Sequence, residues 1–472
     1  MRAAGLLVLL GTWLCGLLAL PVVQSKVASG HSLVTGVQSR LRLVKDGAIV
    51  ASGKQQVEGA KQRGGPNPPS QSEIWSAVAL VTGTTVGAGV LALPQSTAAA
   101  GFVPSSLVLV GAWIFMAATG LLFAEISTNL AKSSPSDQGL GILAMTERLL
   151  GKAGALPAGT AYVFIHFALL VAYIAGAGDV LSKAFHLPQL AGPLLFTAVV
   201  GSVLTFGSDK QVDRFNNAWV LSVVVSFCGL MGLALPSVNL SHLAHSNFSA
   251  VLSSVPVMLV ALVYHNVVPA ICQQLRYDKD AITKTVLLGS AFPLLMFILW
   301  NGAILGIISP SASDAAAVSD PLASLRDNER FSLLVDVFSE SAIITSFTGF
   351  VIGLLGFFQD VLRPAKSAAS HKPADVAPAP PAKASLALYA AVLLPPTVVA
   401  IAAPDCFNAA LDFAGAYGIT VLFGILPIIM AWLQRAQRGV LQETFVPGGP
   451  AVLGALLLVV SSVVLGKIFA FM

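Results

Sequence analysis

Long apolar stretches separated by short polar segments dominate this 472-residue sequence. Most of them hold about 20 residues, the length that an α-helix needs to cross the ~30 Å hydrocarbon core of a bilayer. The pattern therefore predicts a helical protein that crosses a membrane many times. We predict eleven spans, at residues 76–98, 103–131, 157–181, 189–207, 215–236, 251–273, 284–309, 331–361, 385–403, 407–433 and 450–471.

The composition agrees with this pattern. Hydrophobic residues make up 56% of the chain and charged residues only 10%, with a mean hydropathy of +0.82. Soluble domains carry about 25% charged residues, so most of this surface is expected to meet lipid. We predict an all-α polytopic membrane protein. No HExxH, GxSxG or paired intramembrane aspartates occur in the sequence, so no enzyme is expected, and nothing indicates a nucleic-acid partner.

Lysine and arginine are distributed unevenly between the loops. They precede span 1 and follow spans 2, 4, 6, 8 and 10, whereas the alternate loops are poorer in them. Cytoplasmic loops carry an excess of these residues. We therefore expect the start of span 1 to face the cytosol or its topological equivalent, and the C-terminus to lie on the opposite side.

The first 73 residues differ from the rest. Residues 1–25 resemble a signal-peptide core, and residues 26–73 form a basic, acid-poor segment expected to be a disordered transit region or linker before the transporter domain at 74–472. A second flexible segment, rich in Pro and Ala, is expected at 364–384. A cleaved secretory signal would place the new N-terminus on the side that the charge bias disfavours. Import into a plastid agrees with the charge bias, so we favour the plastid inner envelope as the location. A plasma membrane or an endomembrane is the alternative.

One apolar span contains residues that should unwind it. Residues 79–94 read ALVTGTTVGAGVLALP, with three glycines and three threonines inside span 1. A potassium-filter mimic would need a preceding pore helix, and a dinucleotide loop would need a βαβ unit. A third interpretation is the discontinuous helix of a secondary transporter, in which freed backbone groups bind a ligand at mid-membrane.

Span 6 has a matching interruption. Tyr264, His265 and Asn266 lie in the middle of this span and are followed by Pro269, which lacks a backbone donor. Broken spans five apart are expected when spans 1–5 and 6–10 form two halves. We therefore predict a five-plus-five inverted repeat of the leucine-transporter type, with helices 1 and 6 broken and span 11 as an addition.

Several motifs resemble a known family, the hydroxy/aromatic amino-acid permeases, and in particular the tyrosine and tryptophan permeases. The resemblance extends from about Ile74 to the C-terminus. It implies a transporter of tyrosine or tryptophan that works by proton symport and alternating access. The matching motifs are GTTVGAGVLALP, AYIAGAGD, VDRFNN, SVPVMLVALVYHNVVPAI, GSAFPLLMFILWNGAILG, TSFTGFVIGLLGFFQD, LPP and LDFAGAYG.

The same resemblance implies where the substrate binds. The carboxylate would meet backbone N–H groups around Thr85–Gly89, and the ammonium would meet carbonyls near Gly83 and at Tyr264–Asn266. Tyr173 would bond the carboxylate or pack as an ordinary aromatic residue. The implied substrate-binding residues are Gly83, Thr84, Thr85, Gly87, Gly89, Tyr173, Tyr264, His265 and Asn266, with Phe347 and Phe350 as further candidates for the wall.

Ionisable residues inside spans are rare because their burial is costly. Glu125 and His265 are therefore candidates for proton coupling. The alternatives are a Glu125 carboxylate solvated at a helix end and a neutral His265 that bonds the unwound backbone. Asn408 and Asp412 are candidates for a gate of the outer vestibule.

The coupling ion expected from the resemblance is H⁺. Sodium is the competitor, because the hydroxyls of Thr345, Ser346 and Thr348 could face span 1, although such hydroxyls commonly bond their own helix. No cofactor or resident metal is expected. A membrane sensor that binds an amino acid without moving it, and a sodium-coupled carrier of other neutral amino acids, are the alternative functions.

Overall fold

The computed structural model describes residues 68–134, 137–308, 321–326, 328–362, 384–437 and 442–471. The predicted leader at 1–25, the linker as far as residue 67 and the loop at 364–383 lie outside these ranges. Every regular element in the described part of the chain is a helix. The all-α fold class predicted from the apolar pattern is therefore confirmed.

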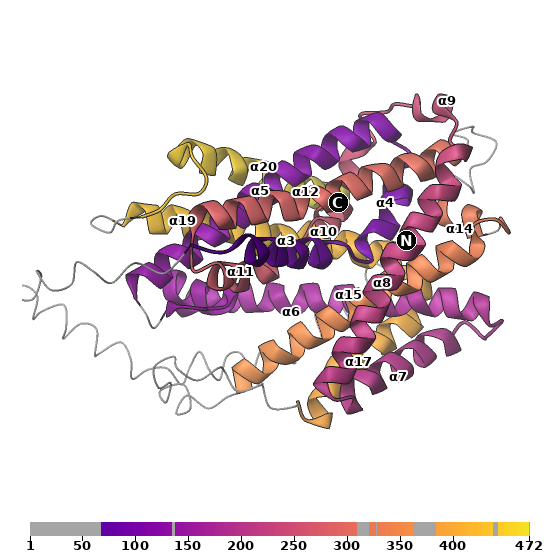
Figure 1. Cartoon of the computed structure of the whole chain (residues 1–472), viewed down its shortest axis with the longest axis horizontal. Coiled ribbons are helices and arrows are strands. Elements are labelled where there is room, and N and C mark those ends of the chain that lie inside the picture. The colour runs from indigo at the N-terminus through magenta and orange to yellow at the C-terminus, as the bar shows by residue number, and fades with distance from the viewer. Residues whose placement is uncertain are drawn as a thin grey trace, which may run out of the picture.

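The helices follow one another closely along the chain (Figure 1). In order they are α3 (Gln71–Thr85), α4 (Gly89–Thr97), α5 (Phe102–Ser133), α6 (Ile142–Ala184), α7 (Ala191–Phe206), α8 (Asp209–Ala234), η2 (Leu235–Ser237), α9 (Leu240–Leu243), η3 (Val251–Ser254), α10 (Val255–Ala261), η4 (His265–Val267), α11 (Val268–Gln274), α12 (Lys279–Ile307), α14 (Pro321–Arg326), α15 (Ser332–Leu362), α17 (Leu386–Ala402), η6 (Pro404–Cys406), α18 (Phe407–Phe413), η7 (Ala414–Ile425), α19 (Leu426–Ala436) and α20 (Gly449–Phe471).

Each predicted span overlaps one or more of these apolar helices. Within the described ranges, eight helical stretches are long and apolar enough to cross a membrane, or nine if the bent pair α3 and α4 is one span. The helices α7 and α17 are apolar but shorter. The multi-pass architecture is thus established, and the number of eleven crossings stays a prediction.

Two helices depart from the predicted spans. α6 begins at Ile142, well before the predicted span at 157–181, and a turn at Gly151 (φ 67°) interrupts it. Glycine adopts this backbone conformation without steric cost. The segment η7 is a π-helix of 12 residues within the predicted span 407–433. A π-helix widens the backbone locally, and nothing in a hydropathy pattern signals it.

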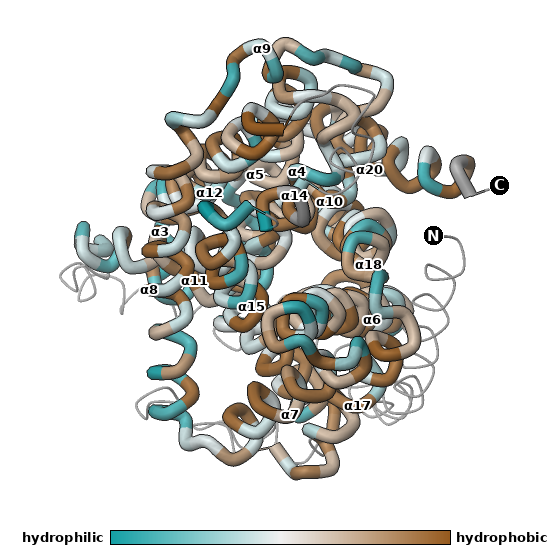
Figure 2. The backbone as a smooth tube through the Cα atoms, turned by 90° about the vertical axis from the view of Figure 1, so that its right-hand side faces the viewer, coloured by the Kyte–Doolittle hydropathy of each residue, from teal (hydrophilic) through white to brown (hydrophobic). Residues whose placement is uncertain are grey.

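Burial separates the central helices from the peripheral ones. The most apolar window of α6 is 83% buried, whereas those of α8 and α20 are 28% and 11% buried. Large hydrophobic side chains such as Leu221, Val225 and Leu458 are exposed on these peripheral helices, and brown, hydrophobic segments occur throughout the backbone tube (Figure 2). Such a surface is expected where helices face lipid. α6 therefore belongs to the core, and α20 packs against the rim of the bundle.

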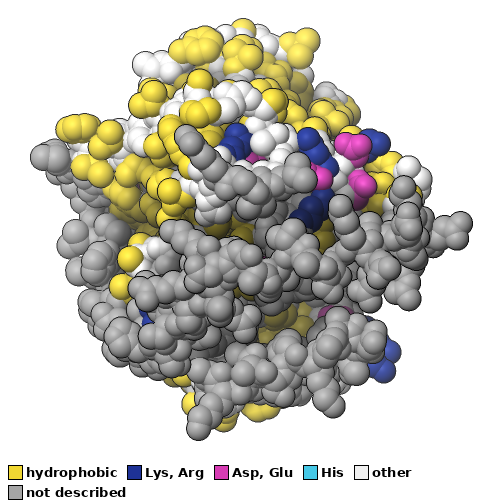
Figure 3. Space-filling view, turned by 90° about the vertical axis from the view of Figure 1, so that its left-hand side faces the viewer, with side chains coloured by type: hydrophobic (Ala, Val, Ile, Leu, Met, Phe, Trp, Pro, Cys, Tyr) yellow, Lys and Arg dark blue, Asp and Glu magenta, His cyan; other side chains and the backbone are white. Residues whose placement is uncertain are grey.

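Different helices lie at the two ends of the molecule. Figure 1 shows α9 and α14 at the right-hand end and α11 and α19 at the left-hand end. Basic and acidic side chains gather on the left-hand face (Figure 3). The charge bias predicts that this face is the cytoplasmic or equivalent side, and we call the end with α9 and α14 the outer end accordingly.

An ion pair at the predicted cytoplasmic end joins the two broken spans. Ser70 caps α3 and shares a capping box with Glu73, so α3 begins at Gln71, before the predicted domain boundary. The guanidinium of Arg276, just after α11, lies 2.6 Å from Glu73 Oε1. Hydrogen bonds from Arg276 and Ser70 lower the pKa of Glu73 to about 2. This contact ties the inner ends of both broken spans together.

Candidate functional site

The break in span 1 lies where the glycines predict it. α3 ends at Thr85 and α4 starts at Gly89, with a bend of 54° between them. A methyl group added at Gly87 would overlap the Ser346 hydroxyl, and one added at Gly89 would come within 2.9 Å of Ala261 Cα. Both glycines are therefore required for close approach of neighbouring helices. The predicted break in span 1 is confirmed, with Gly87 inside it and Gly89 at the start of α4.

Span 8 supplies a side chain to this break. Ser346 Oγ accepts a hydrogen bond from the Ala88 N–H at 2.9 Å, and the Tyr173 hydroxyl lies near the same serine. The N–H of Gly87 has no acceptor among the described residues. Backbone of span 1, Ser346 of span 8 and Tyr173 of span 3 therefore meet at one point.

The break in span 6 lies directly against that of span 1. α10 ends at Ala261, residues 262–264 are not helical, and the chain resumes in η4 and α11. The N-terminal end of α4 at Gly89 thus contacts the C-terminal end of α10. A helix N-terminus carries partial positive charge and a C-terminus partial negative charge. Opposite helix poles therefore meet at mid-molecule.

Tyr264 and His265 point away from this junction, toward α5. The Tyr264 hydroxyl donates to Met116 O at 3.1 Å, and its ring fills the space next to Gly120. His265 Nε2 lies 2.9 Å from the Thr119 hydroxyl, and Nδ1 has no hydrogen-bond partner among the described residues. In this conformation the two rings lock span 6 against span 2.

Three of the predicted binding residues lie elsewhere. Gly83 and Thr84 are exposed on α3, and a Cβ at Gly83 would meet nothing within 4 Å. Asn266 is exposed at the start of the inner half of span 6. Thr85 is buried, but its hydroxyl bonds Val81 O in its own helix. The structure thus brings together Gly87, Gly89 and Tyr173 and separates Gly83, Thr84 and Asn266 from them.

The three hydroxyls proposed for sodium behave differently from one another. Ser346 reaches span 1, as described above. Thr345 donates to Ala342 O in its own helix. The Thr348 hydroxyl is buried and has no hydrogen-bond partner in the described part of the chain. Only Ser346 therefore faces the backbone of span 1.

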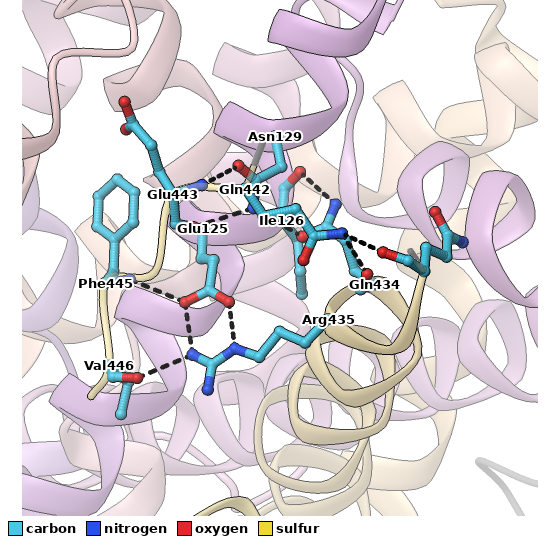
Figure 4. A network of polar contacts seen from close by, with 10 residues as sticks. Glu125, Ile126, Asn129, Gln434, Arg435, Gln442, Glu443, Phe445 and Val446 are labelled. Atoms are coloured by element: carbon cyan, nitrogen blue, oxygen red, sulfur yellow. Dashed lines mark hydrogen bonds and ion pairs between the residues drawn. The ribbon is translucent and has the colours of Figure 1, made fainter. Parts of the chain in front are cut away.

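Glu125 has a partner that the sequence did not indicate. Its carboxylate forms a bidentate pair with Arg435 of α19, with N–O distances of 2.6 and 2.7 Å, and also accepts from the Phe445 N–H (Figure 4). The Glu125 side chain is 0% exposed. The interpretation of Glu125 as a solvated helix-end carboxylate is therefore wrong. Arg435 lies in the last turn of α19, at the end of span 10. This basic residue at a helix end was the signal in the sequence that could have indicated a partner for Glu125.

A cavity of about 240 Å³ lies at the outer end of the bundle. Its lining includes Leu91, Ala175 and Ile343, each within one helical turn of Gly89, Tyr173 and Ser346. Asn408 donates to Gln95 at 2.5 Å, which joins α18 to α4 at this cavity. Asp412, the second gate candidate, instead pairs with Lys467 of α20. The cavity therefore leads toward the helix breaks and is bridged by Gln95 and Asn408.

The wall candidates form part of an aromatic cluster. Phe350 contacts Tyr173 and His166 with ring centroids 5.7 and 4.9 Å apart. Phe347 packs edge-on against Phe196 at 5.0 Å and is 0% exposed. Phe350 is therefore beside the Tyr173 corner of the junction, and Phe347 is a packing residue between span 8 and span 4.

Comparison with known proteins identifies the family. Residues 70–467 match the tryptophan/tyrosine permease family. This chain belongs to that family. The resemblance inferred from the sequence motifs is confirmed, and the protein is a permease, not an enzyme. The helix breaks, Gly87, Gly89 and Tyr173 all lie within the matched region.

Individual relatives cover most of the permease. It is 28% identical over 404 residues to tyrosine-specific transport system 2 of Haemophilus influenzae, covering 82% of this chain and 94% of the relative. It is 27% identical to the tryptophan-specific transport protein of the same organism, covering 76% and 87%. A mutant manganese transporter of Eremococcus coleocola is 13% identical with a TM-score of 0.52, covering 84% and 87%. This last likeness concerns the fold alone, which is of the leucine-transporter type.

Proposed function

We propose that this permease carries tyrosine or tryptophan across its membrane together with a proton, by alternating access. The observation that carries the proposal is the junction of the two broken spans, where Gly89 of α4 lies against Ala261 of α10. The tyrosine- and tryptophan-specific relatives support the choice of substrate.

The junction suits the two charges of an amino acid. The carboxylate binds the N-terminal end of α4, where the Gly87 N–H is available and the helix dipole is positive. The ammonium binds carbonyl groups at the C-terminal ends of α3 and α10, near Thr85 and Ala261. No charged side chain is required, because the opposed helix poles match a zwitterion.

The aromatic ring of the substrate extends toward spans 3 and 8. Tyr173 and Phe350 provide aromatic surface there, and the Tyr173 hydroxyl reaches Ser346 beside the break. Aromatic pairs favour offset or edge-to-face contacts, which add specificity for a ring over an aliphatic chain. This corner therefore selects the side chain, while the backbone of the breaks selects the amino-acid group.

Alternating access requires the outer cavity to open and close. In this structure the hydrogen bond between Gln95 and Asn408 joins α4 to α18 at that cavity. We assign this bond to the outer gate, which breaks when substrate enters. Asp412, paired with Lys467, supports the packing of α20 and has no role in the gate.

Proton coupling requires a residue that can bind and release a proton. Of the two candidates, Glu125 is held by Arg435 and a backbone N–H, whereas His265 Nδ1, next to the break, has no partner in the described part of the chain. Of these two groups, His265 is therefore the less constrained. Sodium is the second candidate ion, because Ser346 faces span 1 and the Thr348 hydroxyl, two residues further on, has no partner among the described residues.

The test is uptake of labelled tyrosine and tryptophan into proteoliposomes under a proton gradient and a sodium gradient imposed separately. We expect accumulation under the proton gradient alone. Accumulation under the sodium gradient alone would show that sodium, not the proton, is the coupling ion. Binding without accumulation under either gradient would favour a sensor. Glutamine, as a non-aromatic competitor, should leave tyrosine uptake unchanged.

We also propose the plastid inner envelope as the location, on the basis of the basic N-terminal segment and the charge bias of the loops. Sequencing the N-terminus of the mature protein from its native membrane provides the test. A start within the basic segment at 26–73 is expected, and a chain that still begins at Met1 would contradict the targeting leader.

A further inference from the structure

Most acidic side chains inside the spans have a fixed partner. Glu125 pairs with Arg435, and Asp179 with Lys183 at 2.8 Å. Among the acids of the predicted spans whose side chains the structure describes, Glu340 is the one for which no hydrogen bond or ion pair is found. Its Oε1 is buried without a partner.

Glu340 lies in the outer half of α15, next to an ion pair. One helical turn before it, Asp336 accepts from Arg326 Nε at 2.9 Å, and Arg326 also donates to Ser339 at 3.1 Å. Arg326 and Ile343 both line the outer cavity. Glu340 is partly exposed as a residue, although its Oε1 is enclosed.

We propose that Glu340 is the carboxyl that takes up the coupling proton from the outer cavity. The proposal rests on the proton symport proposed above and assigns it a residue. A carboxyl group in a membrane protein interior is neutral when it carries a proton and uncompensated when it does not. An acid without a fixed partner can exchange between these states, whereas both oxygens of Glu125 already accept hydrogen bonds from Arg435.

Arg326 can couple the protonation state of Glu340 to the position of a neighbouring helix. It lies within electrostatic reach of both Asp336 and Glu340. When Glu340 releases its proton, two carboxylates compete for one guanidinium, and Arg326 shifts toward Glu340. Because Arg326 belongs to α14, which contacts both α15 and α4, this shift moves the element that borders the outer cavity. The proton passes from water in the cavity to the carboxylate and is released to the inner side after the conformational change.

The other titratable groups around this stretch of α15 are few. α8 contributes Cys228, next to Gly229, which faces Leu334 of α15. α6 contributes Asp179 and Lys183, paired with each other at the same cavity, and η6 contributes Asp405, which also lines it. α7 has none, and α17 has Tyr389, which is bonded to Leu204 O.

The experiment compares Glu340→Gln with the wild type in proteoliposomes, and Glu329→Gln, an exposed acid of the preceding loop, is the matched control. With a gradient of one pH unit and one proton per substrate, wild type should accumulate tyrosine up to about tenfold. Glu340→Gln should lose this accumulation. It should also lose the substrate-induced proton flux, which an internal pH dye measures. Exchange of labelled for unlabelled tyrosine at equal pH should stay near the wild-type rate. Glu329→Gln should behave as wild type.

Each outcome distinguishes this proposal from the one above. Wild type that transports tyrosine without a proton-driven component would overturn the proton symport itself. Proton-driven wild type together with an equally proton-driven Glu340→Gln would overturn only the role of Glu340. Loss of exchange in Glu340→Gln would also overturn it, because the residue would then be needed for substrate movement. Glu340→Asp keeps a titrating group and should retain coupled flux, with its pH midpoint moved.

Discussion

Gly83 and Gly87 occupy the same sequence motif but meet different surroundings. A methyl group at Gly87 would collide with the Ser346 hydroxyl, whereas one at Gly83 would meet open space. We expect Gly87→Ala to lower tyrosine uptake about tenfold or more, because displacing a packed neighbour costs about 1–3 kcal/mol. Gly83→Ala should leave uptake unchanged. Labelled uptake, with thermal unfolding of both variants in detergent, measures the difference; equal loss in both would contradict the placement of the break.

Ser346 is the side chain that completes this break. Removing its hydroxyl by Ser346→Ala leaves the buried Ala88 N–H without its acceptor, which costs about 1–3 kcal/mol. We expect a lower thermal midpoint and weaker tyrosine binding. Thr345→Ala is the control, since the Thr345 hydroxyl bonds only its own helix. Unaltered binding in Ser346→Ala would exclude a role for this contact in shaping the site.

At the scale of elements, the inner ends of spans 2 and 10 are joined by the Glu125–Arg435 pair. Breaking a buried pair by removing one partner leaves an uncompensated charge and costs about 3–5 kcal/mol. Glu125→Gln and Arg435→Gln should therefore each lower the thermal midpoint strongly. Lys132→Ala removes an exposed pair with Glu443 and should cost less than about 1 kcal/mol. Similar decreases in the thermal midpoint for all three variants would show that the buried pair stabilises the fold no more than the exposed pair does.

The elements were predictable from the sequence to different degrees. The breaks in spans 1 and 6 were located correctly, because glycine and proline act through the local backbone. The π-helix η7 was missed. Its glycines meet other helices, since a Cβ at Gly415 would collide with Pro256 O and one at Gly418 with Ile165. Which helix lies opposite a glycine depends on packing, and hydropathy carries no information on it.

At the scale of the whole molecule, the pH response of transport separates the candidate groups. The folded-state pKa of Glu73, about 2, lies below its ordinary value of 4.5. Its pair with Arg276 is therefore present above pH 4.5 and is lost only as the pH falls toward 2. We expect Glu73→Gln to have the same pH profile of uptake as wild type between pH 5 and 8. A profile that moves in this variant would mean that the inner ion pair takes part in coupling.

By itself, the sequence determined the membrane class, the helical fold, the broken spans and the family. These features follow from apolar length, from local backbone chemistry and from motifs, all of which are properties of contiguous residues. The tertiary structure decided which of those residues meet. Glu125 and Arg435 are 310 positions apart, and Gln95 and Asn408 are 313 apart. No local pattern pairs such residues, because the contact arises only when spans from the two halves of the chain pack side by side.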